Sequence, residues 1–460
     1  TEYMLRKIPS GLWETHYFGK TPLPLIAIGV LTTLFYVFSK PHFDDFSDFN
    51  KLVLSVSGLI SIKIYAAPVW KHPVFHMFWW ALLLAVCHWF FLTLALPDLA
   101  GDYPKLDHIA RLFVFIIFAW WLAGSTQNTL LFWSIASAAV VLAPWIAGDG
   151  LADFQRGFLG ERIGFGIRNV QHSAMFFGTV LLGLLIFLPR LLRAPLQHYG
   201  KLSLWVLAFI IIIAGVIISQ TRATWLGVIA GLLTALFLIF IEHRKSFSKK
   251  YLLIFFILSA CLAILIITNS SLVIERATAE LDTIQALLRG DWSSVPLSTS
   301  EVRSSVGERL YSWRAAIDMI AQRPLLGWGE QGIDYLFDNI QYNQAHYQAL
   351  NFGHLHNLYL EITLQYGLLG LAAYFYLLGW FIANAWFAWK RGDMPGDVLL
   401  FLYAFLCFWS VINLFESYLI FWTGVFLFNV VMAGGLVHIW KPTLRTNSST
   451  PSVISEKDRK

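Results

Sequence analysis

The chain has 460 residues, of which 57% are hydrophobic and 13% are charged. Soluble domains carry about 25% charged residues, so this composition excludes a soluble enzyme, a disordered scaffold and a small disulfide-stapled domain, and it indicates an integral membrane protein. The formal net charge of +5, from 33 Lys and Arg against 28 Asp and Glu, is too small to indicate nucleic-acid binding.

Hydropathy predicts twelve transmembrane helices, because crossing a bilayer core takes about 20 apolar residues. The weakest is the fourth, because Arg111 lies in its first turn. The segment near residue 1 has neither the apolar core nor the cleavage site of a secretory signal, so we expect no cleaved signal peptide. The expected spans are 22–39, 52–69, 73–96, 109–124, 129–147, 172–188, 203–218, 225–241, 251–268, 367–389, 398–415 and 417–440.

The charges of the short loops predict the orientation of these spans. Lys and Arg gather in segments 189–201, 242–250 and 389–393 and in the tail from Lys441. Segments 42–49 and 97–107 are acidic. Because cytoplasmic loops carry an excess of Lys and Arg, we expect both termini and every basic loop to lie in the cytoplasm.

One connection, between spans 9 and 10, is far longer than the others. It contains two predicted helices, and the second has Leu310, Trp313, Ile317 and Ile320 at the spacing of one helix face before Pro324 ends it. We therefore predict a folded helical cap on the outer side. The expected organisation is spans 1–9 in residues 1–268, the cap in 269–355, spans 10–12 in 356–440 and a cytoplasmic tail in 441–460.

The outer segments after residue 148 contain arginine but no lysine. Guanidinium groups bind phosphate oxygens in a fixed, bidentate geometry, so the pattern favours an anionic substrate, whereas pairing with outer carboxylates is the alternative for each arginine taken alone. Arg222 lies in a turn of a few residues, close to the membrane surface, where it reaches either a substrate or a lipid headgroup. The outer arginines are Arg156, Arg162, Arg168, Arg222, Arg276, Arg289, Arg303, Arg309, Arg314 and Arg323.

Histidines mark the return of the cap into the membrane. Asn357 is a good N-cap for the helix that follows, which places His356 at a helix start beside the bilayer. A neutral imidazole there is a competent general base, and local hydrogen bonding is the alternative. His354 and His356 with His346 resemble part of a zinc site, but no cysteine or closely spaced carboxylate completes the set, so we expect no metal and no cofactor.

Two further patterns have less specific interpretations. Segment 327–332 matches GxGxxG, but it follows a helix and has no βαβ context, so it predicts a turn and not a dinucleotide site. Trp313, Trp328 and Tyr311 are suited to stacking on sugar rings, although packing within the cap is the favoured interpretation for each of them taken singly.

The region around His356 resembles a known family. His356-Asn357, nine residues, then Gly367-Leu-Leu-Gly370 is similar to the motif of O-antigen ligases. The preceding GERLYSWRAAIDMIAQRPLLGWG and the turn QTRATWLG resemble segments of the O-antigen ligase and polymerase superfamily. The resemblance implies an all-α polytopic membrane fold of the GT-C-like glycosyltransferase class.

The resemblance also implies an activity, which is transfer of O-antigen from undecaprenyl diphosphate to a sugar hydroxyl of lipid A–core in the periplasmic leaflet, without metal or ATP. The essential histidine of the family corresponds to His356, and its arginines correspond to Arg222 and Arg309. A further family arginine corresponds to either Arg162 or Arg168. The substrate-binding residues expected beside them are Arg162, Arg168, Arg314, His354 and Asn357, and the expected partners are the lipid-linked donor, lipid A–core and membrane lipids.

Two alternative functions remain open on the sequence. A polymerase of the same superfamily uses the same donor but a second undecaprenyl-linked glycan as acceptor. A flippase or transporter of lipid-linked glycans moves its substrate without forming a bond. Intramembrane charge is sparse, with Lys63, Glu361 and Glu416 in apolar segments, whereas coupled transporters tend to carry such residues at mid-depth.

Overall fold

The structure is a computed structural model that describes residues 12–13, 18, 20–192, 199–242, 285, 289, 305–339 and 353–448. The expected span at 251–268, most of the first half of the cap, His346 and the end of the tail lie outside the described residues. Within the described part every regular element is a helix, which confirms the all-α prediction.

Seven described helices are long and apolar enough to cross a membrane, and two shorter apolar helices, α2 and α21, accompany them. The count of twelve spans is therefore not confirmed. The seven are α5 (Pro73–Ala95), α9 (Thr126–Ile146), α11 (Val170–Leu192), α12 (Tyr199–Ile218), α13 (Arg222–Glu242), α20 (Leu358–Lys390) and α22 (Trp422–Ile439). The remaining longer helices are α2 (Leu23–Ser39), α3 (Asp44–Tyr65), α17 (Ser305–Gln322) and α21 (Gly396–Ile412).

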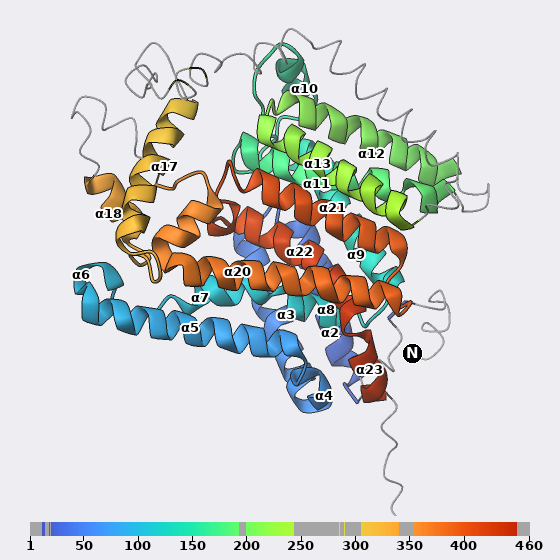
Figure 1. Cartoon of the computed structure of the whole chain (residues 1–460). Coiled ribbons are helices and arrows are strands. Elements are labelled where there is room, and N and C mark those ends of the chain that lie inside the picture. Colours follow the sequence, from blue (N-terminus) through green and yellow to red (C-terminus); the bar gives the residue numbers. More distant parts are fainter. Residues whose placement is uncertain are drawn as a thin grey trace, which may run out of the picture.

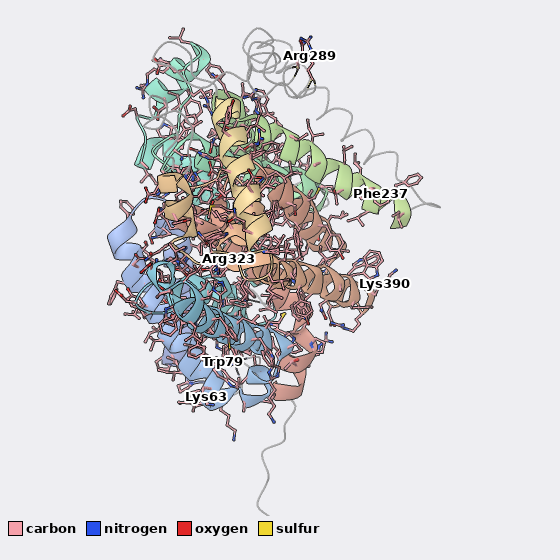
Figure 2. All side chains as sticks on the ribbon, turned by 60° about the vertical axis from the view of Figure 1, so that its left-hand side comes forward. Lys63, Trp79, Phe237, Arg289, Arg323 and Lys390 are labelled. Carbon is pink, nitrogen blue, oxygen red and sulfur yellow. The ribbon has the colours of Figure 1, made fainter. Side chains whose placement is uncertain are left out.

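The long helices form a bundle (Figure 1) in which α20, α21 and α22 lie beside one another and α11, α12 and α13 form a neighbouring group. Helix α22 is its centre, since every residue from Thr423 to Ile439 is buried. Many apolar side chains on the outside are exposed, among them Trp79 on α5 and Phe237 on α13 (Figure 2). Such an apolar exterior suits contact with lipid.

The expected span at 109–124 is an interrupted helix. It consists of α7 (Leu106–Ala110), the 3₁₀ turn η2 (Arg111–Phe113) and α8 (Phe115–Trp121). Asn429 of α22 satisfies the backbone at the interruption, because its Oδ1 accepts from the Phe115 N–H at 2.6 Å and its Nδ2 donates to the Arg111 carbonyl at 2.9 Å. Irregular backbone at membrane depth needs such a protein partner.

One end of the bundle carries α17 and α18 (Gly332–Asn339), and the small helix α23 (Lys441–Ser448) lies at the opposite end (Figure 1). We call the first the cap end. A separate small core holds α17 and α18 against the first turns of α20. Its buried members are Ala316, Ile333, Leu336, Phe337, Leu355 and Leu364.

Helix α20 is broken at Gly367, whose φ of +67° is a left-handed conformation. The turn after α17 takes up the hydrogen bonds that the break leaves open. Trp328 N–H and Gly329 N–H donate to the carbonyls of residues 364 and 365, and the N–H groups of residues 368 and 369 donate to the carbonyls of residues 324 and 325, at 2.8–3.3 Å. The GxGxxG-like segment at residues 327–332 is thus part of the turn that holds the cap against α20.

Gly367→Ala is expected to weaken this junction. An added Cβ would lie 2.1 Å from the Leu325 carbonyl oxygen, and the backbone angles of Gly367, φ +67° and ψ −171°, cost a residue with a Cβ about 1–3 kcal/mol before any clash. The midpoint of thermal unfolding of the detergent-purified protein should fall. Gly379→Ala on the same helix is the control, since nothing lies within 4 Å of its added Cβ; equal midpoints for the two variants would contradict the junction's role.

Candidate active site

The segment that carries the two histidines enters α20 through a side-chain cap. Asn357 Oδ1 accepts hydrogen bonds from the N–H groups of Tyr359 and Leu360, both at 3.1 Å. The expectation that Asn357 is an N-cap is confirmed. Its amide oxygen is thereby committed to the helix start, and this explains its place beside His356 without any contact to a substrate.

His356 itself adopts a left-handed conformation with φ +51°, which costs of order 1–3 kcal/mol and persists only when the surroundings enforce it. The hydrogen bonds that hold this conformation are made by the residues on either side of His356. Leu355 N–H donates to Glu361 Oε2 at 3.0 Å, and the Leu355 carbonyl accepts from Trp313 Nε1 at 2.7 Å. Asn357 N–H donates to Ser417 Oγ at 3.2 Å. The backbone around His356 is therefore held from the cap, from α20 and from the α21–α22 loop.

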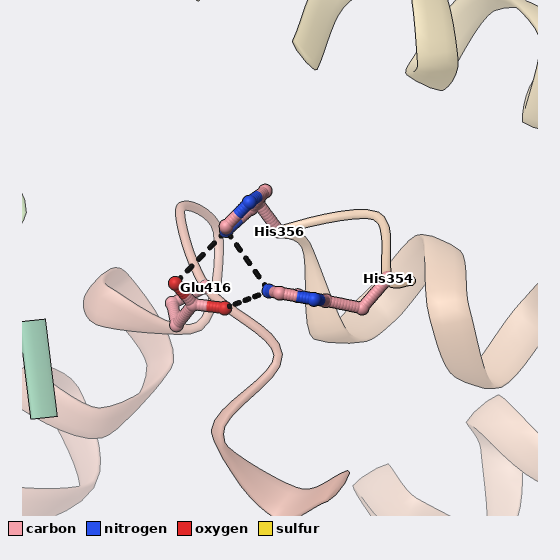
Figure 3. A group of neighbouring side chains, drawn as sticks. All are labelled: His354, His356 and Glu416. Carbon is pink, nitrogen blue, oxygen red and sulfur yellow. Dashed lines mark hydrogen bonds and ion pairs between the residues drawn. The ribbon is translucent and has the colours of Figure 1, made fainter. Parts of the chain in front are cut away.

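The carboxylate of Glu416 lies between the two histidines (Figure 3). Its Oε1 is 2.8 Å from His354 Nε2 and its Oε2 is 2.9 Å from His356 Nδ1. The N–H of Ser417 also donates to Oε1, at 3.0 Å. The Glu416 side chain is 3% exposed, while the two imidazoles are 14–15% exposed. A buried carboxylate thus orients two rings whose edges reach the surface of the site.

Gln171, in the first turn of α11, joins this carboxylate to an arginine. With its amide oriented so that both ends are satisfied, Nε2 donates to Glu416 Oε2 and Oε1 accepts from Arg309 at 2.9 Å. The Gln171 carbonyl accepts from Tyr418 Oη at 3.1 Å. A neutral amide therefore separates the guanidinium from the carboxylate.

The charges of the cluster follow from burial and hydrogen bonding. Burial tends to raise the pKa of Glu416, but the hydrogen bonds from His354 and His356, and the positive charge that these rings carry once protonated in acid, hold it well below its ordinary value. Burial lowers the pKa of His356, and the Glu416 carboxylate only partly opposes this effect, while Arg309 adds to it. At neutral pH the site therefore contains an ionised carboxylate and a neutral His356 imidazole.

The protonated nitrogen of His356 is fixed by its partner. An ionised carboxylate only accepts hydrogen bonds, so Nδ1, which faces Glu416, carries the single ring proton. The lone pair then lies on Nε2, on the other side of the ring. This is the arrangement in which an imidazole accepts a proton from a substrate while a carboxylate stabilises the resulting cation.

Arg168 shares an aromatic ring with the histidines of the site. Its guanidinium stacks 4.0 Å from the centre of the Phe421 ring, and His354 packs against the same ring at 5.1 Å. His172 contacts that ring as well, at 4.9 Å. Of the two arginines between which the sequence does not choose, Arg168 is the one beside the histidines.

Arg162, in the segment before α11, contacts the turn between α12 and α13. Its Nε donates to the Ser219 carbonyl at 3.3 Å, and Gln220 of the same turn donates to the Gly160 carbonyl at 2.9 Å. Arg222 is the first residue of α13 after this turn. The structure therefore brings Arg309, His354 and His356 together, with Arg168 beside them, and groups Arg162 with Arg222.

The remaining predicted residues of the cap have other surroundings. Arg314 is exposed on α17, five residues after Arg309 and hence on a different side of the helix. The indole N–H groups of Trp313 and Trp328 donate to the carbonyls of Leu355 and Met319. Both tryptophans thus pack in the cap, which favours the structural interpretation over sugar stacking.

Glu416 is the site residue that the sequence does not identify. It lies 60 residues beyond His356, and its one signal is a charged residue within an apolar segment. It also supplies the carboxylate that the sequence lacks near the histidines. Among the described residues, His354, His356 and Glu416 are three possible metal ligands, with ligand atoms within 4.8 Å of one another.

Comparison with known proteins supports the family suggested by the motif. Residues 207–375 match the model of a family described as O-Antigen ligase, a range that contains Arg222, Arg309 and His356. Over 340 residues the chain is 24% identical to a protein of Haemophilus influenzae described only as uncharacterized, covering 71% of this chain and 76% of the relative. The family match confirms, over that part of the chain, the resemblance to O-antigen ligases.

Asn357→Ala is expected to lower the midpoint of thermal unfolding, because loss of an N-cap costs about 0.5–2 kcal/mol. Asn357→Ser is the matched control, since a serine hydroxyl also caps helices. The serine variant should retain most of the stability that the alanine variant loses. If the two variants were equally stable, the side chain of Asn357 would not act as the cap.

Proposed function

We propose that this protein is an O-antigen ligase that transfers O-antigen from undecaprenyl diphosphate to a sugar hydroxyl of lipid A–core. The observation that carries the proposal is the His356–Glu416 pair, in which a neutral imidazole has Nδ1 bound to a carboxylate and therefore has its lone pair on Nε2. The family match over residues 207–375, which includes the histidine and two of the arginines, supports this choice.

In the proposed reaction His356 is the general base. Its Nε2 takes the proton from the acceptor hydroxyl as the hydroxyl oxygen attacks the anomeric carbon of the donor. The imidazolium that forms remains paired with Glu416, which lowers the cost of the proton transfer. Direct displacement inverts the anomeric centre. The undecaprenyl diphosphate leaving group supplies the driving force, so neither ATP nor a metal takes part.

The leaving diphosphate needs positive charge, which the cap end supplies in two forms. Arg309 binds Gln171 of the site, Arg168 lies beside the histidine pair, and Arg162 contacts the turn that precedes Arg222. Helices α11, α20 and α22 also all begin in segments that contact this site. Helix N-termini carry partial positive charge and favour anions, so the arginines and the backbone act in the same direction.

The same proposal fixes the orientation of the protein. The donor and acceptor glycans lie outside the cytoplasm, so the cap end faces the periplasm and the end with α23 faces the cytoplasm. This agrees with the basic loops, which the sequence places on the cytoplasmic side of the inner membrane.

His356→Ala is expected to lower turnover by about 10²–10⁴-fold, the usual contribution of a general base, while donor binding is largely retained. The measurement is reconstitution of the purified chain with undecaprenyl-diphosphate-linked glycan and lipid A–core, with EDTA and without ATP, followed by separation of the products by size. His108→Ala, which removes another histidine of the cap end, is the control and should keep its activity.

The products of the wild type also decide between the candidate reactions. A glycan ladder on lipid A–core is the expected result. Growth of glycan on the undecaprenyl carrier alone would identify a polymerase. Movement of the glycan across vesicles without a new bond, unaffected by His356→Ala, would identify a transporter, and either of these results would overturn the ligase.

Glu416→Gln is expected to change the pH dependence as well as the rate. In the wild type the rate should fall on acidification only below the ordinary histidine range, because burial lowers the pKa of His356. The carboxylate opposes that shift, so its loss should move the acid limb to still lower pH and reduce the plateau by about 10²-fold or more, since an amide no longer fixes the ring proton. A lower plateau with an unmoved acid limb would mean that Glu416 only supports the fold.

A further inference from the structure

We propose that His354, His356 and Glu416 also bind one divalent transition-metal ion such as Zn²⁺, and that its binding inhibits the transfer reaction. His354 Nε2 lies 3.1 Å from His356 Nδ1, and each nitrogen lies 2.8–2.9 Å from an oxygen of Glu416. The three side chains thus present their ligand atoms to one small space (Figure 3). The binding site stands on this geometry alone, whereas the inhibition rests on the proposed function.

The spacing matches what a zinc ion requires. Zn–N and Zn–O bonds of about 2.0–2.2 Å in a tetrahedron separate the ligand atoms by about 3.3 Å. The two nitrogens are 3.1 Å apart and each lies 2.8–2.9 Å from its own Glu416 oxygen, so small movements bring the ligand atoms to that separation. Three protein ligands leave a fourth position, which suits a water molecule.

The ligand types select the class of ion. Two imidazoles and one carboxylate suit Zn²⁺, Co²⁺ and similar ions, whereas Mg²⁺ and Ca²⁺ prefer sets made of oxygen atoms. The Glu416 carboxylate is also held by groups that are not metal ligands themselves, since Ser417 N–H and Gln171 bind its oxygens. Such contacts orient metal ligands and raise affinity.

Inhibition follows from the single proton of a neutral imidazole. A metal ion binds a ring nitrogen through its lone pair, so the ion at His356 Nδ1 displaces the proton from that nitrogen. The proton then occupies Nε2 of the same ring. Nε2 is the atom that must accept the proton of the acceptor hydroxyl, and in this tautomer it has no lone pair to do so.

The binding site is tested by calorimetric titration of ZnCl₂ into the detergent-purified full chain carrying a non-histidine affinity tag. We expect one Zn²⁺ per chain. His354→Ala and Glu416→Gln should each weaken binding by at least about tenfold, since even contacts one step removed from a metal contribute that much. His76→Ala, which removes an exposed histidine of α5, is the control and should bind as the wild type does.

A second measurement does not depend on the folding of variants. Addition of CoCl₂ to the wild type should produce the strong visible absorption of four-coordinate cobalt, and ZnCl₂ should abolish it. The absence of that absorption, or equal Zn²⁺ affinity in the wild type and in well-folded His354→Ala, would overturn the metal site.

The inhibition is tested in the reconstituted transfer assay. Saturating ZnCl₂ should reduce the rate of the wild type at least tenfold, and excess EDTA should restore it. Full activity with Zn²⁺ bound would overturn the inhibition. If no transfer occurs even in EDTA while one Zn²⁺ still binds to the three side chains, the proposed function fails, the inhibition falls with it, and the metal site stands.

Discussion

The candidate site depends on one buried anion, the carboxylate of Glu416. Removing a carboxylate from water costs several kcal/mol unless hydrogen bonds replace the lost hydration. Here the replacement comes from His354, His356, Ser417 and Gln171. These donors belong to the segment before α20, to the α21–α22 loop and to α11. Because the Glu416 carboxylate requires all four donors, it also specifies how these three distant parts of the chain are arranged at the cap end.

A second carboxylate supports the first. Glu361, in the first turn of α20, accepts from Leu355 N–H and from Ser417 Oγ, so it connects the histidine segment to the loop that carries Glu416. Trp313 then connects the same segment to the cap. The strained backbone of His356 is held by these contacts rather than by its own conformational preference, and a rigid base of this kind needs little reorganisation when a substrate arrives.

Much of the fold can be predicted from the sequence, because lipid imposes length and hydropathy on each spanning helix. The long apolar runs of α9, α11 and α20, the N-cap at Asn357 and the helix that ends before Pro324 all follow from local patterns. Local patterns do not predict contacts between residues that are far apart in the chain. The interrupted helix at Arg111 depends on Asn429, and the break at Gly367 depends on the turn at residues 324–329. Glu416 reaches His356 only through the packing of α21 and α22, which no spacing in the sequence encodes.

The neutral amide of Gln171 explains how opposite charges coexist in so small a site. In a direct contact the charges of Arg309 and Glu416 would pair with each other. With the amide between them, Arg309 donates a hydrogen bond to Gln171 and Gln171 donates one to Glu416, whose charge remains paired with His356. A glutamine at this position is therefore better suited to the proposed chemistry than the glutamate that would bind Arg309 more strongly.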